Sequence, residues 1–167
     1  MPKKEVVKRA RQAKSQGKAP TTQAGEFVRE EIRHVREGKH GARSPKQVIA
    51  IGLSKARRAG VDLPPPPKGK TSERTRRSAQ RALERGQGAP PLRKPSQRRA
   101  RAITAALKKE PRQTASHEAL SRQTESAARK RSPGERSAAA KKAARTKGPA
   151  GRSAAAKKAA RTRARRA

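Results

Sequence analysis

The sequence contains no cysteine, tryptophan or tyrosine, and it has one phenylalanine and one methionine among its 167 residues. The absence of cysteine excludes a disulfide framework, a thiolate metal site and a cysteine nucleophile. Because alanine supplies much of the apolar fraction and buries little area, few segments can offset the roughly 1–2 kcal/mol of backbone entropy lost per ordered residue. Together with a net charge of +35, this composition predicts a chain that is mostly disordered and all-α where it is ordered.

Long apolar runs are also missing. The longest strongly apolar run, Val48–Leu53, is far shorter than a bilayer span, which needs about 20 residues. The first residues, MPKKEVVKRARQAK, lack the apolar stretch of a secretory signal. We therefore expect no membrane association and a cytoplasmic location.

Residues suited to catalysis or metal binding are sparse. His34, His40 and His117 are scattered along the chain, and no carboxylate and nucleophile stand at a spacing that pairs with them. The helical pattern around His34 predicts an exposed side chain for it. The stretch GKHGARS at 38–44 lacks the GxxxxGK(S/T) spacing of a phosphate-binding loop. We therefore expect no enzymatic activity, no cofactor and no metal site.

Residues 20–63 carry the pattern of a folded unit. Apolar residues recur at helical spacing in the first half, while charged residues, Glu30 among them, fill the other face. We expect this first helix to begin at Thr21 or Thr22, either of which can cap it, and to end at Gly38.

A second helix is predicted after a short loop. Ser44-Pro45-Lys46-Gln47 has the pattern of a capping box with proline at the first helical position, and Gly60 is placed to end the helix. Two helices joined in this way predict an N-terminal antiparallel helical hairpin. Its expected core consists of Phe27, Val28, Ile32, Val35, Val48, Ile49 and Leu53.

The flanking segments carry weaker signals. Residues 1–19 are predicted to form a basic arm, and residues 64–95 a Pro/Arg-rich linker with a helix signal at 72–85. Residues 96–131 contain short basic stretches with thin apolar stripes, which predict nascent helices rather than packed ones.

The last segment, residues 132–167, carries 12 Lys/Arg and a single acid, Glu135. It contains two 16-residue repeats, SPGERSAAAKKAARTK and GPAGRSAAAKKAARTR, which agree at twelve positions. We expect Ser137 and Ser153 to cap short helices that repel their own cations in water and form on contact with phosphates.

The cations expected to bind nucleic acid lie mostly in these repeats. Arg57 and Arg58, at the end of the second hairpin helix, either contact phosphates as well or complement the dipole of their own helix. In the repeats and the residues after them, the expected contacts are Lys141, Lys142, Arg145, Lys157, Lys158, Arg161, Arg163, Arg165 and Arg166.

The stretch SPKQVIAIGLSKARRAGVDLP at Ser44–Pro64 resembles a motif of small basic bacterial proteins of unknown biochemical function. Some proteins of that family are labelled plasmid stabilisation proteins, which implies maintenance of DNA without specifying a mechanism. The C-terminal tail is similar in composition to the tails of linker histones and of bacterial nucleoid proteins. This likeness implies a role in DNA compaction.

These features predict a non-enzymatic, sequence-tolerant DNA-binding protein of a bacterial nucleoid or plasmid. Duplex DNA is the expected partner, and the hairpin is expected to give self-association, as a homodimer, or a protein contact. Two alternatives remain. The first is an RNA- or ribosome-associated basic protein, and the second is an adaptor that binds a protein through the hairpin.

Overall fold

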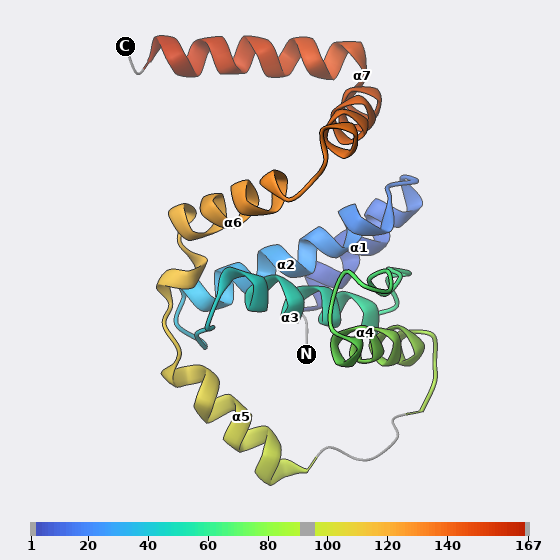
Figure 1. Cartoon of the computed structure of the whole chain (residues 1–167), viewed down its shortest axis with the longest axis vertical. Helices are drawn as coiled ribbons and strands as arrows, with labels where there is room; N and C mark the ends of the chain where they lie inside the picture. Colours follow the sequence, from blue (N-terminus) through green and yellow to red (C-terminus); the bar gives the residue numbers. More distant parts are fainter. Residues whose placement is uncertain (1–2, 91–95, 166–167) are drawn as a thin grey trace. The chain divides into compact units, whose positions relative to one another are not determined.

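The computed structural model of the chain describes residues 3–90 and 96–165. Of these residues, 75% are helical and none is in a strand. The chain divides into two compact units, Met1–Gln123 and Thr124–Ala167, and its elements are drawn in Figure 1. In chain order these elements are α1 (Lys4–Ser15), α2 (Pro20–Arg36), α3 (Pro45–Arg58), α4 (Glu73–Gly86), α5 (Gln97–Lys109), the 3-10 turn η1 (Gln113–Ala115), α6 (His117–Arg129) and α7 (Pro133–Ala164).

The prediction of a mostly disordered chain is wrong, because the described residues are predominantly helical. Composition misleads here for two reasons. Alanine buries little area but permits close helix packing, and alanines make up much of the buried core. The basic segments are rich in Ala, Arg and Lys, which favour helix, and a helix bonds its own backbone without needing a core.

Helices α2 and α3 form the expected antiparallel hairpin at the centre of the first unit (Figure 1). Gly52 of α3 lies against the backbone of Val28 on α2, so close that a Cβ at Gly52 would stand 2.7 Å from the Val28 Cα. The small residue therefore permits the two helices to approach closely at this crossing.

The ends of the hairpin helices follow local backbone signals. As predicted, the Ser44 hydroxyl accepts a hydrogen bond from the Gln47 amide, at 3.3 Å. The Gln47 side chain, however, accepts from the amide of Arg43 instead of that of Ser44, so the reciprocal half of the box is displaced by one residue. Helix α2 begins at Pro20 without a side-chain cap, which corrects the expectation for the two threonines.

The helix termini at Gly38 and Gly60 are confirmed. Both glycines have positive φ, 75° and 87°, and each directly follows the C-cap residue of its helix. Beyond Gly60 the amide of Val61 donates to the Ala56 carbonyl and the Val61 side chain is buried. This is the arrangement in which the chain folds back over the last turn of a helix.

The N-terminal arm is itself a packed helix. Helix α1 runs along α2 in the opposite direction, with Arg9 paired to Glu26 at 2.9 Å (Figure 1). Val6 and Ala10 are buried in one cluster with Phe27 of α2 and with residues at the end of α3. The arm thus completes the core at one end of the hairpin.

The expected hairpin core is partly buried and partly at an edge. Phe27, Val35 and Val48 are fully buried. The other four residues are half-buried, namely Val28, Ile32, Ile49 and Leu53. Of these, Ile49 and Leu53 line a groove of about 500 Å³ whose other walls include residues of α4.

The last turn of α5 and the segment after it close the loop end of the hairpin. Ala115 of η1 is buried with Val35 and Val48, and its carbonyl accepts from Arg36 at 2.8 Å. The amide of Gly41, in the α2–α3 loop, donates to the Leu107 carbonyl at 2.7 Å. These contacts fix the loop although its partners are more than 60 residues away in sequence.

Helix α4 packs against the end of α3. Its N-terminus is capped by Ser72, which accepts from the Thr75 amide. Gly86 lies inside α4, where a Cβ would collide with the Arg57 carbonyl. Helix α4 ends at Gly86, one residue beyond the helix signal at 72–85, and the chain turns at Gly88, which has a φ of 100°.

The second unit contains the long helix α7, none of whose residues is buried. It begins with a complete capping box between Ser132 and Glu135, with proline at the first helical position. It is kinked at Gly148, where φ is 66° and ψ is 173°, and Pro149 begins the second half. Ser137 and Ser153, which were expected to cap short helices, lie inside the two halves of α7 instead.

Among the described helices, none has both the length and the apolar character that a membrane span requires.

Candidate functional sites

The repeats form a rod in two halves, residues 133–147 and 149–164, each about 22–24 Å long at 1.5 Å per residue. Helix α7 contains ten Lys/Arg and one acid, which stands in its first turn. None of its residues is buried. Its cations therefore face solvent along the whole helix.

Within each half, three predicted cations share one face. Because successive residues turn by about 100°, Lys141, Lys142 and Arg145 occupy roughly a quarter to a third of the circumference. Lys157, Lys158 and Arg161 repeat this arrangement after the kink. Alanine is the commonest of the remaining residues, and no bulky apolar side chain stands among them.

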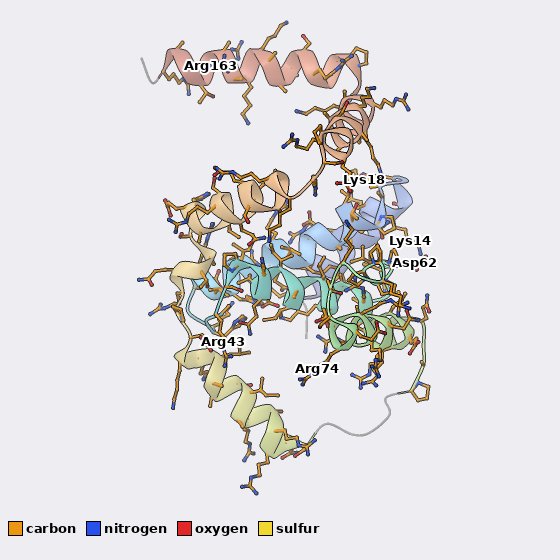
Figure 2. The ribbon with its side chains drawn as sticks, viewed as in Figure 1. Lys14, Lys18, Arg43, Asp62, Arg74 and Arg163 are labelled. Atoms are coloured by element: carbon orange, nitrogen blue, oxygen red, sulfur yellow. The ribbon has the colours of Figure 1, made fainter. Side chains whose placement is uncertain are left out.

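The other predicted cations of the tail differ in position. Arg163 lies in the last turn of α7 (Figure 2), and Arg165 is its exposed C-cap residue. Arg166 lies outside the described residues.

Arg57 and Arg58 occupy contrasting environments at the end of α3. Arg57 is buried, and its guanidinium donates to the carbonyls of Leu63 and Pro64 at 2.9 and 3.0 Å. Burial lowers the pKa of Arg57. Its donors thus fasten the start of the proline run to α3, whereas Arg58 is exposed and donates to the carbonyl of Ser54 one turn back.

The first unit adds further exposed cations. Lys14, Lys18 and Arg74 project from its surface (Figure 2). Arg43 is paired with Glu110 at 2.7 Å, and that hydrogen bond raises the pKa of the Arg43 guanidinium. Exposed positive charge is therefore a property of both units.

Sequence analysis misses a buried polar cluster on the inner side of the hairpin. Glu31 is 0% exposed and Glu30 only 2% exposed, although the pattern placed Glu30 on the solvent face. The side chain of His34, expected to be exposed, is 12% exposed and lies 3.2 Å from Glu31. His40 reaches the same carboxylate from the α2–α3 loop, at 2.9 Å.

A lysine from α3 completes the cluster. Lys55 Nζ lies 2.5 Å from Glu31 Oε2. Burial raises the pKa of Glu31, but its contacts with the Lys55 ammonium and the two imidazoles outweigh burial and hold the pKa below its usual value.

A sequence signal for this cluster is faint. Glu31 and His34 are three residues apart, the spacing at which helical neighbours meet. The other members of the cluster, however, come from α3 and the α2–α3 loop, and only the folded chain brings these elements together.

Comparison with known proteins identifies one family. Residues 11–68 match a family of unknown function (DUF6496). The matched segment runs from α1 through the hairpin and the four prolines, roughly a third of the chain. It is consistent with the resemblance to an uncharacterised family noted from the motif. No curated protein and no solved structure matches the chain.

Proposed function

We propose that the protein is a non-enzymatic protein that binds duplex DNA without sequence preference and acts on the DNA of a bacterial nucleoid or plasmid. The observation that carries this proposal is the exposed helix α7. It holds ten Lys/Arg in two repeats, and its sequence contains no acid after Glu135 that could neutralise them.

Charge and shape together favour phosphates over base edges. Lysine and arginine on an exposed helix can follow a phosphate backbone, and the counterions released supply the free energy of binding. The alanines between them offer few groups for reading bases, so the contacts position the helix without specifying a sequence. Two copies of one cationic face, joined at Gly148, give multivalent attachment.

Maintenance of DNA also fits the motif in α3, which resembles that of proteins labelled for plasmid stabilisation. In this scheme the hairpin supplies self-association or a protein contact, and α7 together with the exposed cations of the first unit holds DNA.

The proposal is tested by neutralising the shared face of α7. Lys141, Lys142, Arg145, Lys157, Lys158 and Arg161 are all replaced by glutamine, which keeps helix propensity. Each phosphate contact contributes about −0.9 to the slope of log K against log salt on B-form DNA, so the slope should become shallower by up to about 5. Binding is measured by fluorescence anisotropy with several unrelated duplexes at a series of salt concentrations.

A matched variant exchanges lysine for arginine and arginine for lysine at the same six positions. Because charge is retained, affinity and salt slope should stay close to those of the unaltered protein. An equal loss in both variants would mean that side-chain geometry matters, and an unchanged slope after neutralisation would refute phosphate binding by α7.

The nucleic acid used in cells is identified by crosslinking followed by sequencing of both bound DNA and bound RNA. Recovery of chromosomal or plasmid DNA across many sequences supports the proposal. Recovery of mainly ribosomal RNA would favour the RNA-associated alternative instead.

A further inference from the structure

The buried cluster brings together three side chains of types that bind metal ions. Glu31 and His34 are one turn apart on α2, and His40 lies in the loop that follows. One ligand atom from each lies within 4.8 Å of the others. Glu31 Oε1 is the common centre, 2.9 Å from His40 Nε2 and 3.2 Å from His34 Nδ1.

We propose that Glu31, His34 and His40 bind a divalent transition-metal ion such as Zn²⁺. Bonds of about 2.0–2.2 Å from Zn²⁺ to imidazole nitrogen and carboxylate oxygen place neighbouring ligand atoms roughly 3.0–3.5 Å apart. Both separations measured from Glu31 Oε1 are close to that range. Two imidazoles with one carboxylate suit Zn²⁺ and related ions better than Ca²⁺ or Mg²⁺, which prefer oxygen alone.

Two of the three ligands are already oriented by a second contact. His40 Nδ1 donates to the Gly41 carbonyl at 3.0 Å, which leaves Nε2 directed at Glu31. The Lys55 ammonium pairs with Glu31 Oε2, so Oε1 faces the imidazoles. Metal-binding histidines almost always donate their other ring N–H in this way, and metal-binding carboxylates are held by outer partners.

The third ligand has a comparable partner. His34 Nε2 lies 3.8 Å from Glu30 Oε1, beyond hydrogen-bond distance but close enough that a small rotation of the ring would form a bond. Glu30 Oε1 also accepts from the Lys3 amide at 3.1 Å. Its other oxygen, Oε2, is buried without a hydrogen-bond partner.

The charge of the cluster favours an added cation. The Glu30 and Glu31 side chains are 1% and 0% exposed, and Lys55 is the one lysine or arginine whose charged group the described contacts place on either carboxylate. A buried charge without compensation is costly. The imidazoles are 12% and 17% exposed, so an ion has a path to the cluster from the histidine side.

A metal ion at this position would act on the hairpin. It would join α2 to the α2–α3 loop through its ligands and to α3 through the Glu31–Lys55 pair. The cluster lies in the first unit and the DNA-binding face proposed above lies in the second. Metal binding and DNA binding by α7 can therefore fail or succeed independently.

The first test uses the fact that the chain has three histidines. The full-length protein without a histidine tag is freed of metal with a chelator and titrated with Zn²⁺, and the imidazole resonances are followed by NMR. We expect the signals of His34 and His40 to change with one equivalent, and that of His117 to stay in place. Equal effects on all three histidines, or none, would overturn the proposal.

The second test measures affinity by competition with a chromogenic chelator. His34→Gln and His40→Gln should each weaken Zn²⁺ binding by more than roughly 10–100-fold, the cost of losing an outer partner alone. The matched control His117→Gln should leave the affinity unchanged. Zn²⁺ should raise the melting temperature of the unaltered protein and of the control, but not of His40→Gln.

These tests separate the metal site from a simple ion-pair network. If His34→Gln or His40→Gln binds Zn²⁺ as tightly as the unaltered protein, the metal is held elsewhere. If the unaltered protein keeps its imidazole signals and melting temperature through the titration, the cluster is an ion-pair network and the metal proposal is wrong.

Discussion

The close crossing of α2 and α3 makes a quantitative prediction about Gly52. A Cβ added at Gly52 would lie 2.7 Å from the Val28 Cα and 2.9 Å from the Val28 amide nitrogen. Both atoms belong to the backbone of α2, so rotation of a side chain cannot relieve the contact. Gly52→Ala must therefore push the two helices apart or strain them.

Gly25 provides a matched control on the facing helix. It is also helical, and a Cβ placed there would meet nothing within 4 Å. Replacing either glycine by alanine gains about 0.8–1 kcal/mol of helix propensity. Gly25→Ala should thus stabilise the hairpin by up to about 1 kcal/mol.

The difference between the two variants isolates the packing contact, because the gain in propensity cancels. Overpacking a close contact costs typically about 1–3 kcal/mol. We therefore expect Gly52→Ala to be less stable than Gly25→Ala by about 1–3 kcal/mol. Relative to the unaltered protein, Gly52→Ala should range from nearly neutral to about 2 kcal/mol less stable.

The assay must report on the hairpin alone, because α7 contributes much of the helical signal and belongs to the other unit. Native-state hydrogen exchange of the Phe27 amide, within α2 beside a fully buried side chain, gives the free energy of opening. Equal protection in Gly52→Ala and Gly25→Ala would show that the helices do not approach as closely as described.

Three substitutions and one control test other contacts of the first unit by hydrogen exchange of the amide at position 27. Phe27→Ala should destabilise the hairpin by about 3–5 kcal/mol, because it removes the largest fully buried side chain; a loss below 1 kcal/mol would mean that the core at that end is loose. Ser44→Ala should cost about 1 kcal/mol through the lost helix cap, and no change would show that the cap is replaced by water. Arg57→Met should cost about 1–3 kcal/mol, because two backbone carbonyls lose their donor. The control Arg58→Met removes the exposed arginine next to Arg57 and should change stability little. A loss similar to that of Arg57→Met would mean that burial does not distinguish the two arginines.

Local signals allowed the hairpin to be predicted from the sequence. Helix ends depend on a few neighbouring residues, so Gly38, Gly60 and the Ser44 cap could be placed without knowledge of the fold. The start of α2 was misplaced because two threonines and a proline offered competing beginnings, and the proline at the first position prevailed.

The order of the remaining chain was underestimated because burial was judged from bulky side chains. Val6, Ala10 and Ala115 are buried against other elements of the fold, and their small side chains give only a weak local signal of a core. In α7 the prediction gave too much weight to repulsion between cations and too little to alanine propensity. The capping box that begins at Ser132 was also overlooked.

The buried cluster could not be predicted for a different reason. A glutamate on an amphipathic helix is normally solvent-exposed, and burying it requires cations that arrive from other elements. Lys55 is 24 residues away and His40 lies in a loop, so their meeting at Glu31 is a property of the tertiary structure.

The two proposed sites also differ in their relation to the matched family. The match at residues 11–68 contains Glu31, His34, His40 and Lys55, whereas every cation of α7 lies outside it. If the cluster binds metal, that property belongs to the segment shared with the family and stabilises the hairpin. Under the proposed function, the repeats add phosphate binding to a hairpin that does not itself depend on DNA. Neutralising α7 should accordingly leave Zn²⁺ affinity unchanged, and His40→Gln should leave the salt slope of DNA binding unchanged. A change in either would show that the two units are coupled.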